Sequence, residues 1–206
     1  MKEELMPRKH NFLYRLFKFI AKVFFSLFYK VEFTDINSIP EKGPLIMCAN
    51  HISLLDMFLI GYSMKRKIYY IAKNELFKNP LLAFLVGRLG AFPTNRGRPD
   101  VRSFRTVLSL LSEGHIVGIF PEGTRVDIKN KDSIRTKPGV AYIAIKSGAP
   151  ILPVAIEGNY KLFSRLKVVF GQPFKLELDQ EKKYSMEELV ELSVGVMQKV
   201  HKLREA

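Results

Sequence analysis

A histidine and an aspartate stand five residues apart, at His51 and Asp56, between two apolar segments. An imidazole held by a carboxylate can act as a general base, because the carboxylate keeps one ring nitrogen protonated and leaves the other free. On an ideal helix, residues five apart lie about 140° apart around the axis and face different directions. The two side chains can therefore pair only if His51 lies outside the helix that carries Asp56.

The flanking sequence predicts such an arrangement. The apolar residues 44–49 are typical of a buried strand, and the apolar residues 54–60 are long enough for a helix. Ser53 and Asp56 match the capping-box pattern, so we expect the helix to begin after Ser53, with His51 in the preceding loop. Asp56 then lies in the first turn, where the helix dipole favours a carboxylate. Ser53 could instead be a nucleophile, but capping explains it, and no Gly-x-Ser-x-Gly motif is present.

Composition and charge limit the class of protein. The chain has 206 residues and a hydrophobic content of 47%, which predicts a single domain with a sizeable core. Its net charge of +13 indicates anionic partners, such as phosphorylated ligands, anionic lipid, an acidic carrier protein or nucleic acid. Cys48 is the only cysteine, and its place in an apolar strand indicates a buried structural thiol. No cluster with metal-ligand spacing is present, and we expect no metal.

The segment 11–29 predicts an amphipathic helix. Its polar residues recur at helical spacing and form one stripe: Arg15, Lys18, Lys22 and Ser26. The remaining surface is broad, apolar and rich in phenylalanine, which is typical of a helix that lies in a membrane interface. No charge-free run is long enough to span a bilayer, and docking on the domain core is the alternative. We therefore expect residues 1–30 to associate with a membrane and residues 31–206 to form the domain.

Strands and helices alternate over residues 44–156, which predicts an α/β domain with a mixed, largely parallel sheet flanked by helices. Further strands are expected at 31–34, 67–72, 90–94, 116–120, 151–156, 166–170 and 174–178. Further helices are expected at 74–88, in two pieces divided at Asn79-Pro80, and at 100–112, 139–146 and 185–203. In such sheets, ligands bind beyond the carboxyl ends of the strands. Four predicted strands end at residues whose side chains could bind a ligand or take part in a reaction: His51, Lys73, Arg96 and the segment 121–125.

Two of these strand ends carry arginines. Arg96 lies between Asn95 and Gly97, and Arg125 closes the segment Pro121-Glu122-Gly123-Thr124-Arg125. A planar guanidinium can hold a phosphate through two hydrogen bonds, and a glycine allows the backbone to approach a ligand. A solvated surface charge is the alternative for either arginine, and Glu122 could simply pair with Arg125.

Four sequence blocks, in this order, resemble those of the glycerolipid acyltransferases. They are Asn50-His51-x-x-x-x-Asp56, Gly90-Ala91-Phe92-Pro93-Thr94-Asn95-Arg96-Gly97, Phe120-Pro121-Glu122-Gly123-Thr124-Arg125 and Ile151-Leu152-Pro153-Val154. The resemblance covers about residues 30–175, and the third block is its most distinctive part. It implies transfer of an acyl group from acyl-CoA or acyl carrier protein to the sn-2 hydroxyl of lysophosphatidic acid. The product would be phosphatidic acid for phospholipid biosynthesis, with the thioester as co-substrate and no cofactor.

The resemblance also implies roles by position. His51 would be the base and Asp56 its orienting partner. The acceptor would be bound by Lys73, Arg96, Glu122, Gly123, Thr124 and Arg125, with Arg125 on its phosphate. Pro153 belongs to a block linked to acyl-donor use, although a structural proline explains it equally. The segment 81–92 could line an acyl-chain groove or pack in the core. The expected location is the cytoplasmic face of the cell membrane, with peripheral attachment and no nucleic acid partner.

Three other functions are compatible with parts of the sequence. The same chemistry could act on glycerol 3-phosphate, another lysolipid or an acyl-sugar intermediate. The charge permits a nucleic-acid-binding protein, but no zinc finger, RNP-type motif or heptad array is present. A catalytically silent membrane adaptor would not need the pair of His51 and Asp56.

Overall fold

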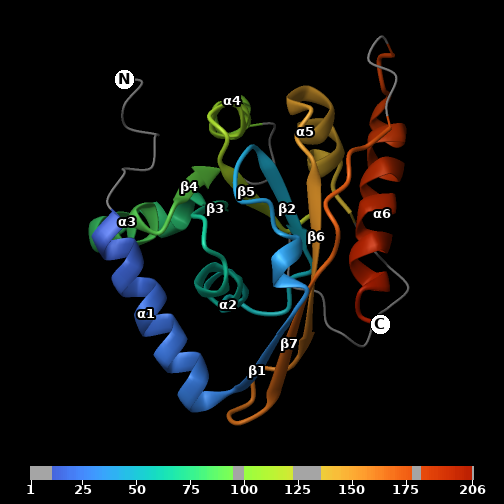
Figure 1. Ribbon diagram of the computed structural model, residues 1–206. Coiled ribbons are helices and arrows are strands. Elements are labelled where there is room, and N and C mark those ends of the chain that lie inside the picture. Colours follow the sequence, from blue (N-terminus) through green and yellow to red (C-terminus); the bar gives the residue numbers. More distant parts are fainter. Residues whose placement is uncertain (1–10, 95–99, 123–135, 178–181, 206) are drawn as a thin grey trace.

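In the computed structural model, seven strands form one sheet between two layers of helices (Figure 1). The structure describes residues 11–94, 100–122, 136–177 and 182–205. The strands are β1 (Lys30–Thr34), β2 (Leu45–Ala49), β3 (Ile68–Lys73), β4 (Ala91–Thr94), β5 (Ile116–Ile119), β6 (Ile151–Gly158) and β7 (Arg165–Phe170). Their order is β1-β7-β6-β2-β5-β3-β4, and only the pair β6 and β7 is antiparallel. The predicted α/β fold with a largely parallel sheet is confirmed.

Two hydrophobic cores lie on opposite faces of the sheet. The helices α1 (Asn11–Phe28) and α2 (Asp56–Ser63) cover one face, and α4 (Val101–Ser112), α5 (Gly139–Ser147) and α6 (Met186–Lys202) cover the other. The central strand β2 is buried on both faces, with Met47 in the first core and Cys48 in the second. A strand enclosed in this way reads as a continuous apolar run, which is why β2 was predictable. Burial raises the pKa of the Cys48 thiol, and its predicted structural role is confirmed.

The local signals around residue 80 also gave the correct structure. A short 3-10 helix, η2 (Asn74–Phe77), is followed by α3 (Pro80–Arg88). The side chain of Asn79 accepts hydrogen bonds from the backbone N–H groups of Leu81 and Leu82, and proline occupies the first helical position. The predicted division of this segment is therefore confirmed.

The strand predicted at 174–178 is wrong. Phe174 forms a single antiparallel bridge with Ile151, and residues 175–177, which are the rest of this segment that the structure describes, are not in a strand. β7 pairs with β6 from Val154 onwards, and the N–H of Gly171 donates to the carbonyl of Pro153. β7 therefore occupies this edge of β6 except at Ile151, the first residue of β6. Residues 175–177 have no further strand residues to pair with, so they do not continue as a strand.

The helix α1 has apolar side chains on two faces. Phe25 is buried against the sheet, whereas an outer row is exposed to solvent: Phe12, Leu16, Phe19, Ile20, Val23 and Leu27. The predicted polar stripe is wrong at Lys18, which turns inward and donates a hydrogen bond to the carbonyl of Met64 after α2. Burial lowers the pKa of Lys18. No helix within the described residues is long and apolar enough to cross a membrane.

Candidate active site

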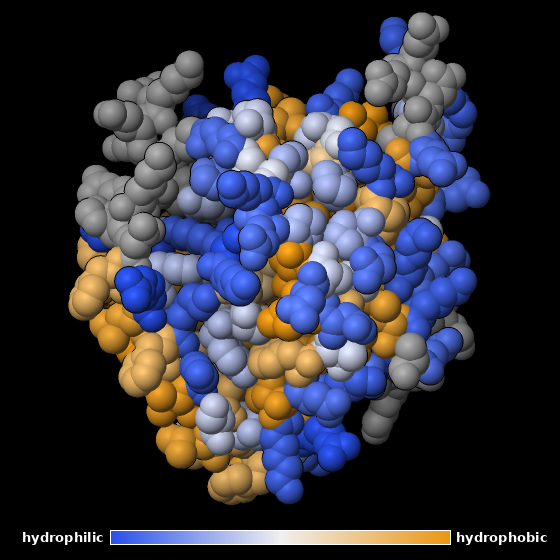
Figure 2. Space-filling model, in the orientation of Figure 1, coloured by the Kyte–Doolittle hydropathy of each residue, from blue (hydrophilic) through white to orange (hydrophobic). Residues whose placement is uncertain are grey.

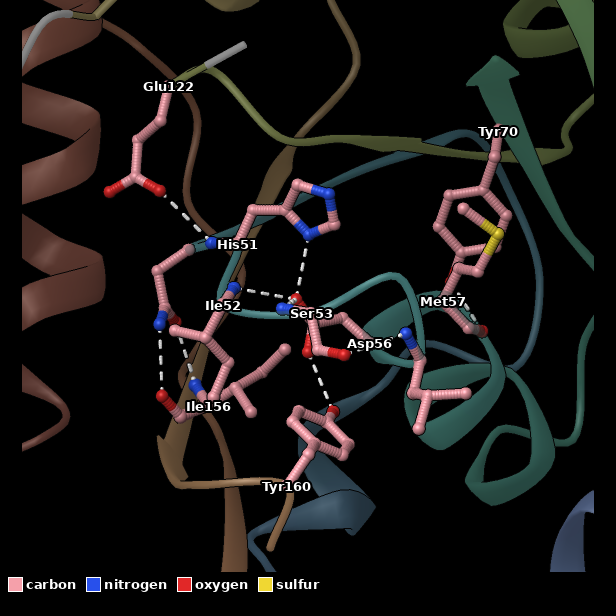
Figure 3. A network of polar contacts seen from close by, with 11 residues as sticks. His51, Ile52, Ser53, Asp56, Met57, Tyr70, Glu122, Ile156 and Tyr160 are labelled. Carbon is pink, nitrogen blue, oxygen red and sulfur yellow. Dashed lines mark hydrogen bonds and ion pairs between the residues drawn. The ribbon is translucent and has the colours of Figure 1, made fainter. Parts of the chain in front are cut away.

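The structure brings His51 and Asp56 together, as their spacing predicts (Figure 3). His51 lies in the loop after β2, and Asp56 is the first residue of α2. Nδ1 of His51 lies 2.7 Å from Oδ2 of Asp56. Only 12% of the imidazole side chain is exposed, and the carboxylate is completely buried.

The loop between the two residues differs from the prediction. The helix begins at Asp56 rather than directly after Ser53, whose carbonyl accepts the N–H of Asp56 at 3.1 Å in a turn. The Ser53 hydroxyl accepts the N–H of Leu55 at 3.2 Å instead of capping the helix. Only half of the capping box forms, in which the carboxylate of Asp56 accepts the N–H of Ser53. The turn holds the imidazole and the carboxylate on the same side of the backbone.

Four donors surround the carboxylate of Asp56. Oδ2 accepts hydrogen bonds from the ring of His51 and from the backbone N–H groups of Ile52 and Ser53, at 2.7 and 2.8 Å. Oδ1 accepts the hydroxyl of Tyr160 at 2.6 Å. An ionised carboxylate is a pure acceptor, so this environment suits its charged form. Because the carboxylate of Asp56 accepts a hydrogen bond from Nδ1 of His51, this ring nitrogen carries the imidazole proton. Nε2 of His51 is then left to accept a proton from a bound molecule.

A stack of two aromatic rings supports the imidazole, one from the residue after β5 and one from β3. The ring of His51 lies 4.4 Å from that of Phe120 at an interplanar angle of 26°, and Phe120 is 6.0 Å from Tyr70. The hydroxyl of Tyr70 donates to the carbonyl of Met57 in α2 at 3.3 Å. Gly118 makes room for Tyr70, because a Cβ atom at that position would lie 2.4 Å from Cε1 of the tyrosine ring. Three elements therefore fix the plane of the imidazole.

The backbone of the loop is held by Glu122 and Asn50. Oε2 of Glu122 accepts the N–H of His51 at 3.0 Å, and Oε1 lies 3.9 Å from Nε2 of His201. Burial raises the pKa of Glu122, and the hydrogen bond from His51 opposes this shift. The side chain of Asn50 exchanges two hydrogen bonds with the backbone of Ile156, which joins the end of β2 to β6. These contacts position His51 relative to the edge of the sheet.

The remaining predicted site residues are placed only in part. Lys73 is the last residue of β3, and its side chain lies outside the described part of the structure. Four other predicted residues also lie outside it: Arg96, Gly123, Thr124 and Arg125. In the sequence they follow β4 and β5, whose carboxyl ends lie at the same edge of the sheet as His51. Their role in acceptor binding stays a prediction.

Tyr160 is the functional residue that sequence reasoning missed. It follows β6, the neighbour of β2, and therefore lies at the same edge of the sheet as Asp56 (Figure 3). Burial raises the pKa of the Tyr160 hydroxyl, and the negative charge of Asp56 raises it further, so the hydroxyl remains a donor. The only signal for it in the sequence is a hydroxyl-bearing side chain shortly after the predicted strand 151–156.

An apolar pocket lies between α1, α2, β3 and α3. Its lining includes Phe17, Met57, Tyr70, Val86 and Leu89. Tyr70 belongs both to this wall and to the ring stack that ends at the imidazole. The pocket has a volume of about 60 Å³, and the rings of Tyr70 and Phe120 separate it from His51. Within the described ranges, no three His, Cys, Asp or Glu side chains gather in a way that could hold a metal ion.

The fold and the site together define a class of α/β proteins in which a histidine, oriented by a buried carboxylate, can take a proton from a bound nucleophile. Comparison with known proteins gives the family. The family model described as Acyltransferase matches residues 30–157, and the chain belongs to this family.

Relatives and a solved structure agree with this assignment. The chain is 30% identical to the 1-acyl-sn-glycerol-3-phosphate acyltransferase of Bacillus subtilis, over 91% of this chain and 96% of that protein. It is 33% identical to the human 1-acyl-sn-glycerol-3-phosphate acyltransferase beta, over 72% of this chain and 53% of that protein. The crystal structure of the 1-acyl-sn-glycerophosphate (LPA) acyltransferase PlsC from Thermotoga maritima superposes with a TM-score of 0.66 at 27% identity. That match covers 94% of this chain and 80% of the Thermotoga chain.

Proposed function

We propose that this protein transfers a fatty acyl group from acyl-CoA or acyl carrier protein to the sn-2 hydroxyl of 1-acyl-sn-glycerol 3-phosphate, giving phosphatidic acid. The observation that carries the proposal is the 2.7 Å contact between Nδ1 of His51 and the fully buried carboxylate of Asp56. The proposal is supported by the family assignment and by the names of the relatives at 30 and 33% identity.

The proposed reaction needs one base and no covalent acyl-enzyme. Nε2 of His51 takes the proton of the acceptor hydroxyl while the hydroxyl oxygen attacks the thioester carbonyl carbon. The resulting tetrahedral intermediate collapses, the carbon–sulfur bond breaks, and the imidazolium returns the proton to the leaving thiolate. Asp56 stabilises the imidazolium in between, and a base positioned in this way typically contributes about 10²- to 10⁴-fold.

We assign the phosphate of the acceptor to the basic groups at the edge of the sheet. Lys73, Arg96 and Arg125 follow or end the strands β3, β4 and β5, and the net charge of +13 favours an anionic substrate. Glu122 belongs to the same block but accepts the N–H of His51, so its contribution is to position the base. A carboxylate in direct contact with the phosphate would repel it.

We assign the apolar pocket between α1 and α3 to a part of the acyl chain of a substrate, because its volume of about 60 Å³ is too small for a whole chain. Its wall is formed by aromatic and aliphatic side chains, and Tyr70 connects it through Phe120 to His51. The expectation that residues 81–92 contribute to an acyl-chain groove is supported by Val86 and Leu89 in this wall. The same residues also contribute to packing around β3 and β4.

We further propose that α1 lies in the interface of the cytoplasmic face of the membrane. Its outer row of exposed apolar side chains repeats at helical spacing, and Arg15 and Lys22 flank that row. Each cation would contribute about 1 kcal/mol near an anionic surface. This surface can be altered without opening the core, whereas deletion of the helix would remove the buried Phe25.

The test is thiol release by the purified protein with each pair of donor and acceptor. Lysophosphatidate, glycerol 3-phosphate and other lysolipids should be compared as acceptors, with acyl-CoA and acyl carrier protein as donors. We expect turnover with lysophosphatidate and a loss of about 100-fold or more in the variant His51→Ala. Faster turnover of glycerol 3-phosphate or another lysolipid would replace the proposed acceptor, and an unchanged rate in His51→Ala would exclude the base.

Two variants test the binding roles separately. Arg125→Ala should mainly raise the KM of the acceptor, and an effect confined to the thioester donor would contradict the phosphate role. Phe19→Ser removes an exposed side chain of α1 and should reduce co-sedimentation with anionic vesicles. Unchanged co-sedimentation would count against membrane contact by α1.

A further inference from the structure

The turn between β6 and β7 exposes two large apolar side chains at its tip. Leu162 is 63% exposed and Phe163 is 67% exposed, although both lie in a short connection between two well-packed strands. The N–H of Ser164 donates to the carbonyl of Lys161 at 3.1 Å, so Leu162 and Phe163 are the two central residues of a four-residue turn. Surface turns normally carry polar residues at these positions.

The backbone of this turn is unfavourable for the residue that occupies it. Phe163 has a φ angle of 64°, in the left-handed region that glycine and asparagine enter more readily than bulky residues do. Such a conformation is retained where the surrounding structure or a function requires it. Here its effect is to hold a phenyl ring in solvent at the end of the hairpin.

Two backbone hydrogen bonds attach the turn to the junction between α1 and β1. The N–H of Phe163 donates to the carbonyl of Phe28 at 2.7 Å, and the N–H of Lys30 donates to the carbonyl of Ser164 at 3.0 Å. Leu27, the last member of the outer row of α1, is 64% exposed beside this junction. Figure 2 shows apolar surface at the lower left, where α1 lies, and again at the bottom, where the turn lies.

Cations border this apolar tip. Lys30, Lys161 and Arg165 are all exposed and lie within three residues of Phe28 or Leu162 along the chain. Apolar side chains surrounded by cations fit the boundary between the acyl chains and the headgroups of an anionic bilayer. An acidic protein surface would complement the cations but would bury less of the two adjacent, exposed apolar side chains.

We propose that the β6–β7 turn, residues 161–164, is a second membrane-inserting element, which enters an anionic phospholipid bilayer beside the end of α1. It extends the proposed membrane contact of α1, and the two contacts can be tested apart. The base of the turn carries Tyr160, which donates to Asp56 at 2.6 Å. Insertion of the tip would therefore place the active site next to the membrane that holds its lipid acceptor.

The chain contains no tryptophan, so a single introduced indole reports on one site. We would compare Leu162→Trp with the control Met186→Trp. Met186 is 61% exposed and lies at the start of α6. Vesicles of phosphatidylglycerol and phosphatidylcholine should shift the emission of the Leu162→Trp protein to the blue, and brominated acyl chains should quench it. The control should show neither effect. Unchanged emission of the Leu162→Trp protein, with bound protein confirmed by sedimentation, would overturn the proposal.

A second pair of variants measures the contribution to binding. Leu162→Ser combined with Phe163→Asn removes the apolar tip while asparagine tolerates the positive φ angle. We expect vesicle partitioning to weaken by about tenfold or more, with unchanged urea stability and unchanged turnover of detergent-dispersed acceptor. Phe19→Ser weakens partitioning through α1 alone. If only Phe19→Ser weakens it, the turn is not a membrane element and the proposal fails, whereas the contact of α1 and the proposed reaction stand.

Discussion

Replacement of Asp56 by asparagine separates the charge of this side chain from its hydrogen-bonding geometry. The amide oxygen can take the place of Oδ2 and accept from the ring of His51 and from the N–H groups of Ile52 and Ser53. The amide nitrogen then points at the hydroxyl of Tyr160, which can accept as well as donate. We therefore expect Asp56→Asn to fold and to keep the imidazole tautomer in which Nε2 is free.

What this variant loses is the attraction between a carboxylate and the imidazolium that forms during the reaction. Nδ1 and Oδ2 lie 2.7 Å apart. The charge centres are then about 4 Å apart, where unit charges attract by about 4 kcal/mol at an effective dielectric constant of 20. The amide dipole recovers part of this, so we expect a loss of about 3 kcal/mol, which corresponds to a fall of about 10²-fold in kcat.

The assay is the initial rate of thiol release at saturating acceptor, with urea unfolding as the control for the fold. Tyr160→Phe tests the same geometry in combination with Asp56→Asn. The backbone N–H groups of Ile52 and Ser53 still need the amide oxygen when the hydroxyl is absent, so residue 56 should keep its orientation and the imidazole its tautomer. The double variant should therefore lose no more activity than the product of the two single effects. A rate of Asp56→Asn equal to the wild-type rate, or a double variant that loses much more than that product, would refute this reasoning.

Three further predictions concern residues around the site. Gly118→Ala should lower the free energy of unfolding in urea by about 1–3 kcal/mol, because its Cβ would lie 2.4 Å from Tyr70; unchanged stability would contradict the ring stack. Burial raises the pKa of Glu122 above its ordinary value of 4.5, so the folded state binds this proton more tightly than the unfolded chain does. The contribution of Glu122 to the free energy of unfolding is therefore lost as the pH rises above 4.5. Glu122→Gln should remove that part of the pH dependence of the free energy of unfolding. The same pH dependence in the variant and the wild-type protein would contradict this. Cys48 should react with Ellman's reagent only after unfolding, because its thiol is completely buried, and fast reaction of the folded protein would contradict this.

The parts of the site that were predictable from the sequence are local. His51 and Asp56 belong to one loop, and their five-residue spacing restricts how the backbone between them can run. The buried strand before them and the division at Asn79-Pro80 likewise depend on neighbouring residues. Even there, the exact start of α2 was wrong, since the carboxylate of Asp56 turns back to the loop amides and Ser53 does not cap the helix.

The parts that were not predictable depend on contacts between distant segments. Tyr160 is 104 residues from Asp56, and nothing near it in the sequence identifies its partner. The segment after Phe174 has the composition of a strand, but β6 offers it one open position. Lys18 fits the helical periodicity of a solvated stripe, but its ammonium group donates a hydrogen bond to the carbonyl of Met64 at the end of another helix.

The most direct test of the account is the tautomer of His51, measured by ¹⁵N NMR of protein with labelled histidine. The chain has four histidines, and comparison with the spectrum of His51→Gln assigns the signal. The account predicts that the neutral ring of His51 carries its proton on Nδ1, toward Asp56, and leaves Nε2 unprotonated. A neutral ring protonated on Nε2 would contradict it, because that nitrogen could not then accept the proton of the acceptor hydroxyl.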